Sequence, residues 1–522
     1  MTVQNILFVM ADQLRADYLS CTGHPTLTTP NIDALAARGV RFAGAYVQAP
    51  VCGPSRMSFY TGRYVSSHGS TYNGVPLRLG EMTMGDHLRP LGLRVALVGK
   101  THMVADAAGF KRLGLDPGSI EGVLASECGF EPFERDDGLW GDRGTPPDLR
   151  YNEYLRRLGY AGDNPWHDYA NAAQGPGGER KSGWDMRNAR EPARVKEEHS
   201  ETAYMTDRAM EFIAQAGTQP WCLHLSYIKP HWPYMAPAPY HALYGPADVM
   251  APNRDEAERR DPHPVYGAFM RHEESVNFAR DEVRATVIPT YMGLIKQIDD
   301  HLGRLWQFLE ERRLFERTMI VMTSDHGDYL GDHWLGEKEL FHEESVRIPL
   351  IVYDPDAAAN ATRGSQHGGL VEAIDLLPTF IEAAGGTAPG HVLEGHSLLP
   401  VIRGGAGPAR DAVFSECDYA FRAARLELAV APAEARAYMV RTERWKYVLY
   451  EGFRPQLFDL AADPRERRDL GADPQLESVR RALDERLFAW ARHRRSRVTI
   501  SDAEIERRTN THKQRGFPFG VW

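Results

Sequence analysis

The chain has 522 residues, of which 43% are apolar and 25% are charged, an ordinary composition for a globular protein with a large core. This composition excludes disordered, collagen-like and disulfide-scaffold proteins. Acidic residues outnumber basic residues by 71 to 61, so the net charge is −10 and we expect no nucleic-acid partner, which would need a broad basic face. A small cationic pocket for an anion remains compatible with this charge.

The five cysteines are scattered and odd in number, which indicates a reducing compartment and no disulfide framework. No apolar run approaches the ~20 residues needed to span a bilayer, so we expect no membrane association. Residues 6–11 are apolar like a signal-peptide core, but no basic segment precedes them, and Asp12 and Gln13 follow where a cleavage site should lie. We therefore interpret residues 6–11 as a buried strand and expect a cytoplasmic protein.

Apolar runs alternate with helical patterns along the first 400 residues or so. Residues 5–10 have the continuous apolar pattern of a strand buried on both faces. The next segment predicts a helix with Thr29 as N-cap, Pro30 at its first position and Gly39 at its end. Further strands are predicted at residues 94–99, 221–227, 318–323 and 348–353. The alternation predicts an α/β fold whose sheet is covered by helices on both faces.

Polar groups follow four of the predicted strands. In α/β sheets, ligands bind where loops leave the carboxyl ends of the strands. The polar groups at these ends are Asp12-Gln13, Lys100-Thr101-His102, Lys229-Pro230-His231 and Asp325-His326. Four such groups in equivalent positions indicate one functional site.

Two changes of pattern indicate the domain organisation. Residues 105–196 are rich in Gly, Pro, Asp and Trp and too long for an ordinary connection, so we expect an irregular excursion over one edge of the site. Near residue 405 the pattern changes to two short strands, at 437–440 and 445–450, followed by an amphipathic helix. We therefore predict a catalytic domain at residues 1–404 and a smaller C-terminal α+β subdomain at residues 405–522.

The C-terminal segment, residues 501–522, is polar but ends in large apolar side chains. These are Phe517, Phe519, Val521 and Trp522. Exposed apolar groups at a chain end suggest that the segment docks onto a neighbouring surface. We therefore expect a homo-oligomer.

Cys52 lies at the predicted start of a helix, because Pro54 suits the first helical turn. Helix N-termini favour negative charge, and Arg56, one turn further on, adds a fixed cation. These properties favour a thiolate at Cys52, or a bound anion beside it. A buried structural cysteine is the alternative, and it is the commoner fate of a lone cysteine.

The run Cys-x-Pro-Ser-Arg at residues 52–56, followed by Thr-Gly-Arg at 61–63, resembles the signature of the formylglycine-dependent sulfatases. Other segments resemble motifs of this family in the expected order: residues 5–13, 29–42 (TPNIDALAARGVRF), 99–102 (GKTH), 230–233 (PHWP), 324–327 (SDHG), 374–379 (IDLLPT) and 444–469. The resemblance covers almost the whole chain except residues 105–196. It implies an alkaline-phosphatase-like fold, with a large central mixed sheet flanked by helices and a smaller C-terminal α+β subdomain.

The resemblance also implies one divalent cation. Its ligands would be Asp12, Gln13, Asp325, His326 and an oxygen of modified Cys52. In this family a formylglycine-generating enzyme, here an expected partner, oxidises the cysteine to an aldehyde whose hydrate is the nucleophile. Three oxygen side chains and one imidazole suit Ca²⁺ or Mn²⁺ better than a thiolate-seeking ion.

The same resemblance assigns roles around the nucleophile. Arg56 and Lys100 would hold the nucleophile side of the site, and His102 would be the base that expels sulfate or phosphate from the covalent intermediate. His231 and Lys338 would neutralise or protonate the leaving oxygen of the substrate.

A formal charge count favours a small anionic ester as substrate. The metal ion and three basic residues, less two carboxylates, leave about +3, and unit charges ~4 Å apart interact by roughly 4 kcal/mol at an effective dielectric constant of 20. Asn73 is a further candidate for contact with the bound anion. Other histidines near the motifs are interpreted as structural or solvent-facing: His68, His224, His333 and His342.

Two hydrolase activities fit these residues, since sulfate monoesters and phosphonate monoesters or phosphodiesters are all tetrahedral monoanions. Lys100 and His102 resemble the sulfatase branch. Gln13 and His326, in place of the commoner Asp and Asn, resemble the phosphonate hydrolase branch. We favour an arylsulfatase-like sulfatase, with phosphonate monoester hydrolase as the alternative and promiscuity between the two.

Two other interpretations fit less well. An inactive member that binds anions would leave Cys52 unoxidised, but the complete set of catalytic side chains argues against it. A mutase or an alkaline phosphatase would use Ser or Thr as nucleophile, usually with two metal ions, and the cysteine motif argues against that.

Overall fold

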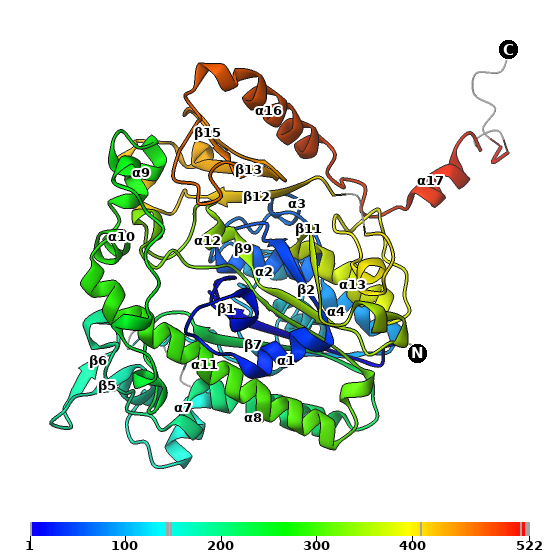
Figure 1. The fold of residues 1–522 in the computed structure, drawn as a ribbon. Coiled ribbons are helices and arrows are strands. Elements are labelled where there is room, and N and C mark those ends of the chain that lie inside the picture. Colours follow the sequence, from blue (N-terminus) through cyan, green and yellow to red (C-terminus); the bar gives the residue numbers. More distant parts are fainter. Residues whose placement is uncertain (1–2, 142–145, 147–148, 408–409, 512–513, 517–522) are drawn as a thin grey trace.

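A nine-stranded mixed sheet forms the centre of the computed structural model, which describes residues 3–141, 146, 149–407, 410–511 and 514–516 (Figure 1). Its strands lie in the order β11 (Ser365–Glu372), β2 (Val40–Tyr46), β10 (Leu350–Tyr353), β8 (Thr318–Ser324), β1 (Asn5–Asp12), β7 (Trp221–Pro230), β3 (Arg94–Gly99) and β4 (Glu131–Arg135), and β9 (Arg347–Ile348) pairs with β2. Strands β8, β1, β7, β3 and β4 are mutually parallel, whereas β10 is antiparallel to both its neighbours. The predicted fold class is confirmed.

Helices cover both faces of the sheet (Figure 1). The core on one face includes residues of α2 (Cys52–Thr61), α4 (Met84–Leu88) and α13 (Leu376–Ala383). The core on the other includes residues of α1 (Pro30–Arg38), α8 (Glu201–Ala216) and α11 (Asp281–Glu311). Strand β1 supplies Ile6, Phe8 and Met10 to the first core and Leu7, Val9 and Ala11 to the second. Its alternate side chains point to opposite faces, and for this reason the whole strand is apolar.

All the predicted strands of the central sheet are observed, although the segment 348–353 is divided between β9 and β10. Strands β2, β4 and β11 were not predicted. Each of them mixes buried residues with partly exposed ones, and β11 begins with five residues that are not buried. Such strands lack the continuous apolar run of β1 and β8, and the full burial of β7.

The segment 105–196 is more regular than its composition suggests. It contains three α-helices, a short hairpin and one strand of the central sheet: α5 (Ala107–Leu113), α6 (Ile120–Ser126), α7 (Arg150–Arg157), β5 (Ala172–Gln174), β6 (Arg180–Ser182) and β4. The prediction of an irregular excursion is wrong for β4, which pairs in parallel with β3. Strand β4 lies at the edge of the sheet, with a strand partner on one side only. This position allows its polar composition.

A second, four-stranded antiparallel sheet follows in the C-terminal part of the chain. It consists of β12 (Ala412–Asp418), β13 (Arg436–Thr442), β14 (Trp445–Tyr450) and β15 (Gln456–Asp459). Helix α16 (Glu477–Arg492) packs on it through Leu483 and Leu487, as its amphipathic pattern predicted. This sheet and helix form the predicted C-terminal α+β unit.

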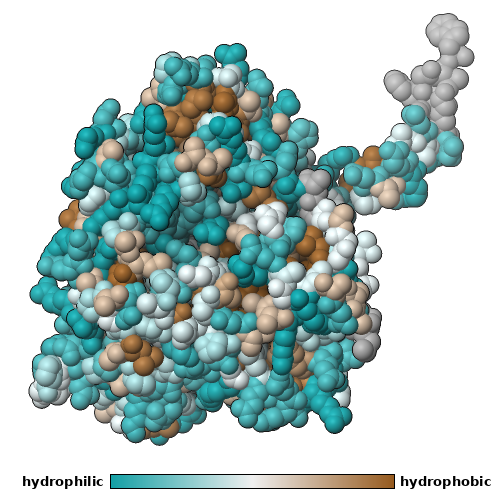
Figure 2. All heavy atoms as spheres, viewed as in Figure 1, coloured by the Kyte–Doolittle hydropathy of each residue, from teal (hydrophilic) through white to brown (hydrophobic). Residues whose placement is uncertain are grey.

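The C-terminal segment with α17 (Asp502–Arg508) extends away from the rest of the chain (Figure 1). The terminal apolar residues that suggested a homo-oligomer, 517–522, lie outside the described residues. Hydrophilic side chains cover most of the face shown in Figure 2. Among the described helices, none is both long enough and apolar enough to cross a bilayer.

His333 has a structural environment, as its interpretation predicted. Its side chain is fully buried, with Nδ1 2.6 Å from Glu258 and Nε2 3.3 Å from Glu344. Burial alone would lower the pKa of His333, but the ion pairs with Glu344 and Glu258 raise it to about 10. The imidazolium form is therefore favoured in the folded chain.

Replacing His333 by Asn should lower the free energy of unfolding by about 3–5 kcal/mol near pH 6, because it leaves two buried carboxylates without their cation. The folded pKa lies above the unfolded value of about 6.5, so the stabilisation is complete below about pH 6.5 and is lost as the pH rises toward 10. Urea unfolding of both proteins at pH 6 and pH 9.5 checks this. An equal difference between the two proteins at both pH values would contradict the charged pair.

Candidate active site

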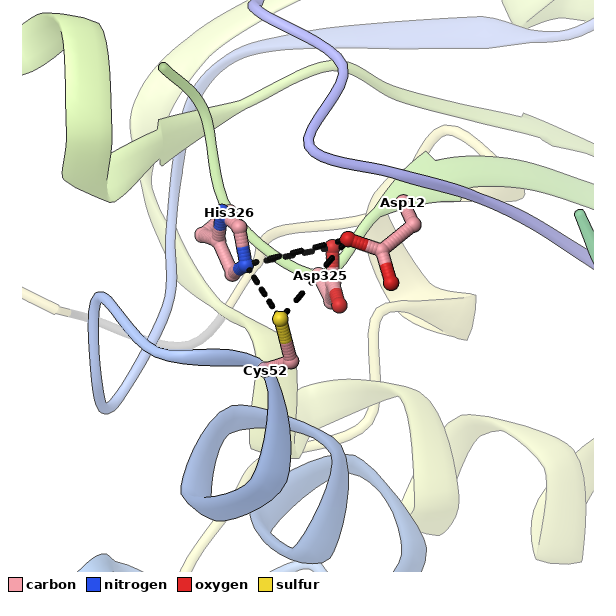
Figure 3. Close-up of side chains that lie close together, drawn as sticks. All are labelled: Asp12, Cys52, Asp325 and His326. Atoms are coloured by element: carbon pink, nitrogen blue, oxygen red, sulfur yellow. Dashed lines mark hydrogen bonds and ion pairs between the residues drawn. The ribbon is translucent and has the colours of Figure 1, made fainter. Parts of the chain in front are cut away.

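The carboxyl ends of β1, β8, β3 and β7 meet at one edge of the sheet, and α2 begins there. Asp12 ends β1, Asp325 and His326 follow β8, and Cys52 is the first residue of α2. These four side chains point toward one another (Figure 3), and their potential ligand atoms all lie within 4.8 Å of one another. All four residues are completely buried. The structure thus brings together most of the predicted metal site.

The donor set of this cluster fits a divalent cation. Two buried carboxylates and an imidazole face the same point, and His326 presents Nε2 to it because Nδ1 lies 2.8 Å from the carbonyl oxygen of Gly327. The Cys52 sulfur lies 3.0 Å from His326 Nε2 and 3.7 Å from an oxygen of Asp12. Hard oxygen ligands with one imidazole suit Ca²⁺ or Mn²⁺.

Arg56 lies behind the carboxylates of the cluster. Its Nε is 2.8 Å from Oδ2 of Asp325 and one of its terminal nitrogens is 3.1 Å from Oδ2 of Asp12. Its other terminal nitrogen donates to the carbonyl oxygen of Lys100 and to Ser226, both at 2.8 Å. Its hydrogen bonds therefore support the predicted metal ligands on the side of the site where Cys52 lies.

Replacing Arg56 by Ala should lower the free energy of unfolding by about 3–5 kcal/mol, since it leaves Asp12 and Asp325 buried without their shared cation. It should also reduce the bound divalent metal per chain, because the two carboxylates lose the guanidinium that orients them. Thermal unfolding and elemental analysis measure the two effects. Arg78→Ala, at a largely exposed arginine, is the control. An unchanged melting temperature and metal content would contradict this role.

Lys100 and His102 lie on the loop that follows β3. Lys100 Nζ is 2.6 Å from Oδ2 of Asp12. The backbone N–H groups of Thr101 and His102 both donate to Oδ1 of Asp137 at 3.1 Å, and His102 has a positive φ of 55°. The sequence analysis missed Asp137, which lies in the segment 105–196 and carries no motif. Its two hydrogen bonds hold the strained backbone of His102 in place.

Cys52 lies in a strongly cationic environment. Burial alone would raise the pKa of its thiol, but Lys338, Lys100 and His326, with a hydrogen bond from His102, lower it well below its ordinary value. The prediction that the start of this helix favours a negative charge is consistent with these neighbours.

Lys338 and His231 lie beside Cys52 and Gln13. Lys338 Nζ donates to Gln13 Oε1 at 2.8 Å and lies 3.4 Å from the Cys52 sulfur and 3.2 Å from His231 Nε2. Nδ1 of His231 is 2.5 Å from the carbonyl oxygen of Trp232, so Nδ1 donates there and Nε2 accepts from Lys338. The side-chain oxygen of Gln13, a predicted metal ligand, is thus bonded to Lys338.

The neighbouring charges determine which of these two buried groups carries the positive charge. Burial, followed by the charges of Lys338 and Lys100, lowers the pKa of His231 to about 3. Burial would also lower the pKa of Lys338, but Cys52, Glu337 and Asp12 raise it above its ordinary value. Lys338 is therefore the cation of the pair, and His231 is a neutral imidazole.

A buried carboxylate that the sequence analysis missed completes this side of the site. Asp328 accepts from Gln13 Nε2 at 2.5 Å and from the Tyr234 hydroxyl at 2.9 Å. Asp328 stands two residues after His326 and directly follows the SDHG motif. This position was the only feature of the sequence that could have marked it as a site residue. The side-chain amide of Gln13 is therefore fixed from both ends, by Asp328 and by Lys338.

Asn73 lies beside the start of α2, where its Oδ1 accepts from the backbone N–H of Gly53 at 2.7 Å. A Cβ atom on residue 53 would lie 2.8 Å from that oxygen, so a larger residue there would displace the Asn73 side chain. The remaining histidines contact residues outside the predicted metal cluster: His68 contacts Ser58, His224 contacts Tyr60, and His342 contacts Tyr329.

Comparison with known proteins agrees with this geometry. Residues 4–386 match the Sulfatase family, and residues 331–493 match the C-terminal region described as N-sulphoglucosamine sulphohydrolase, C-terminal. The chain is 31% identical to the multifunctional alkaline phosphatase superfamily protein PehA of Trinickia caryophylli, over 94% of this chain and 95% of that protein. It is 28% identical to the choline-sulfatase of Rhizobium meliloti, over 90% and 83%.

A similar solved structure is the phosphonate monoester hydrolase SpPMH from Silicibacter pomeroyi. Its TM-score is 0.82 at 27% identity, and the match covers 95% of this chain and 96% of that one. The family match spans most of the chain, and the central sheet, the C-terminal sheet and the buried cluster at the start of α2 accord with it. The chain belongs to the sulfatase family of the alkaline phosphatase superfamily.

Proposed function

We propose that the protein hydrolyses sulfate monoesters through a formylglycine made from Cys52 and one divalent metal ion. One observation carries this proposal: Cys52 begins α2 inside a buried cluster with Asp12, Asp325 and His326. Lysines 100 and 338 lie beside the same cluster. A negatively charged ester is the substrate that this excess of cations favours.

Asp12, Asp325 and His326, with Gln13 beside them, would hold the metal ion. When bound, the ion would polarise an oxygen of the substrate, and the hydrated aldehyde of residue 52 would supply a hydroxyl nucleophile. Arg56 holds the two carboxylates at their outer oxygens, which leaves Oδ1 of Asp12 facing residue 52.

The leaving oxygen of the substrate would lie beside Lys338. This ammonium can donate a hydrogen bond or a proton to the departing group, whereas His231 is neutral and accepts from Lys338. We therefore assign Lys338 as the group that stabilises the leaving oxygen. His231 would position the ammonium group of Lys338. His102 lies on the nucleophile side, where its hydrogen bond to Cys52 suits a base for the hydrated aldehyde.

Hydrolysis of phosphonate monoesters or phosphodiesters is the second candidate activity. Gln13 and His326 at the metal site resemble that branch, and the solved phosphonate monoester hydrolase matches this chain over nearly its whole length. These esters have the same charge and a similar tetrahedral shape, so the same cations would bind them. We rank sulfate ester hydrolysis as the first of the two activities because Lys100 and His102 resemble the sulfatase branch.

The first test is the mass of the tryptic peptide 42–56 from protein produced together with a formylglycine-generating enzyme. We expect the mass of the aldehyde or its hydrate at residue 52. Rates with an aryl sulfate, a phosphonate monoester and a phosphodiester then rank the activities, and we expect the sulfate to have the highest kcat/KM. An unmodified cysteine together with no turnover of any of the three would overturn the proposal.

A further inference from the structure

A cavity of about 860 Å³ is lined in part by residues that adjoin His231 and Lys338 in the chain. Trp232, in its wall, follows His231 directly in the chain, and Glu337 directly precedes Lys338. Tyr234, also in the wall, donates its hydroxyl hydrogen to Asp328, the residue that holds Gln13. The rest of the wall comes from residues 183–187 and 273–286. A substrate whose leaving oxygen meets Lys338 would therefore extend its organic part into this cavity.

Two tryptophans form an aromatic wall in the cavity. Their ring centroids, in Trp184 and Trp232, are 6.4 Å apart, and the Trp232 ring lies 4.7 Å from the His231 ring. Trp184 is 40% exposed although it is a large apolar side chain. Indole faces attract organic cations as well as neutral rings, because the negative face of the ring favours a positive charge.

The charges of the wall decide between these two kinds of occupant. The wall contains five acidic residues and two arginines. Two of the carboxylates are neutralised by arginines, Glu274 by Arg422 and Glu282 by Arg280.

The other three carboxylates of the wall are Asp185, Glu273 and Glu337. Across the part of the chain that the structure describes, their side chains make no hydrogen bond or ion pair, and the same is true of the second arginine of the wall, Arg187. At pH 8, where Glu337 is ionised, these four groups sum to about −2, although Glu337 also interacts with Lys338 at the border of the metal site. This is opposite in sign to the metal site next to it.

We propose that this cavity binds the organic part of the substrate and selects esters whose leaving group carries a quaternary or protonated ammonium. The cationic group would lie against Trp184 and Trp232 near Glu337, while the anionic ester group lies among the cations of the metal site. The inference rests on the proposed function, because it takes Lys338 as the boundary between ester and leaving group. A neutral aryl group would gain the aromatic contact but would leave the three carboxylates unpaired.

A matched pair of substrates tests this selectivity. The esters of 4-(trimethylammoniomethyl)phenol and 4-(2,2-dimethylpropyl)phenol have the same shape and differ by one positive charge; both are made as sulfates and as phenylphosphonates. Measurements at pH 8 keep Glu337 ionised, since burial and the nearby carboxylates raise its pKa to about 7 although Lys338 lowers it. The wild-type protein carrying formylglycine is compared with Glu337→Gln, Trp184→Leu and the surface control Glu316→Gln.

We expect the wild-type protein to prefer the cationic ester. Glu337→Gln and Trp184→Leu should each lower kcat/KM for that ester by about tenfold and change the neutral ester less than about threefold. Glu316→Gln should change neither. Equal losses on both esters would show that Glu337 and Trp184 support the site without selecting charge. That result, or a preference for the neutral ester, overturns the inference while leaving the hydrolase activity intact.

A binding measurement separates the cavity from the chemistry. Benzyltrimethylammonium chloride and neopentylbenzene, which share a shape, are titrated into the Cys52→Ala protein by calorimetry. We expect the cation to bind more tightly, and Glu337→Gln to weaken it. Turnover of neither ester class, with selective cation binding retained, would refute the proposed function and leave a cation-binding cavity. No difference between the two probes would refute the cavity assignment.

Discussion

Replacing Cys52 by Ala should abolish hydrolysis of every ester in the panel, with a loss of kcat of about 10⁴-fold or more, the scale seen when a nucleophile is removed from other hydrolases. The expected loss is large because residue 52 would supply the attacking oxygen, and Cys52 is the only cysteine in the cluster of potential metal ligands found in the described residues.

The fold should tolerate this change well. Cys52 is the first residue of α2, where Ala is acceptable, and Lys338 keeps its hydrogen bond to Gln13 when the sulfur is removed. We therefore expect thermal unfolding of the Cys52→Ala protein to differ little from that of the wild-type protein. Initial rates at saturating substrate and a melting curve measure the two properties together.

Cys222→Ala is the matched control, because Cys222 is equally buried but lies within β7, away from the cluster. It should keep its activity. If the Cys52→Ala protein retained activity within about tenfold of the wild type, the nucleophile would have to be another group. If both variants lost activity together with their cooperative unfolding, the loss at residue 52 would be structural, and the assignment would fail.

The sequence predicts that the site residues meet at one edge of the sheet, because this follows from local patterns. Strands β1, β3 and β8 carry continuous apolar runs and β7 is rich in apolar residues, and the carboxyl ends of parallel strands meet at one edge. Pro54 marked the start of α2, and this places Cys52 at the same edge. These arguments need no knowledge of how distant side chains pack.

The partners of individual side chains could not be predicted in this way. Arg56 was expected on the nucleophile side of the site, but its hydrogen-bond partners there, Asp12 and Asp325, are set by three-dimensional packing. Asp137 and Asp328 each hold a site residue through hydrogen bonds, yet nothing in their immediate sequence distinguishes them from surface carboxylates. The charge count of the pocket was available from the sequence, whereas the pairing of those charges was not.

Replacing Lys338 by Ala should slow esters with poor leaving groups far more than esters with good ones. In the structure Lys338 is the charged member of the Lys338–His231 pair and lies 3.4 Å from the Cys52 sulfur. A poor leaving group develops more negative charge on the departing oxygen and depends more on a nearby cation or acid. We expect a loss of roughly 10²–10⁴-fold for a phenyl or alkyl ester, the usual contribution of an acid catalyst, and about tenfold or less for 4-nitrophenyl esters.

A plot of log kcat/KM against the pKa of the leaving alcohol measures this difference, and the slope should steepen in the Lys338→Ala protein. Lys338→Arg separates the two possible actions of the residue, because arginine keeps the charge but does not release its proton. If the Lys338→Arg protein recovers the activity lost in Lys338→Ala, Lys338 acts by stabilising charge. If it does not, Lys338 acts by donating a proton. The exposed lysine Lys196 provides the control variant Lys196→Ala. Equal slowing of all esters, with an unchanged slope, would remove Lys338 from the leaving-group role and leave it as a support for Gln13.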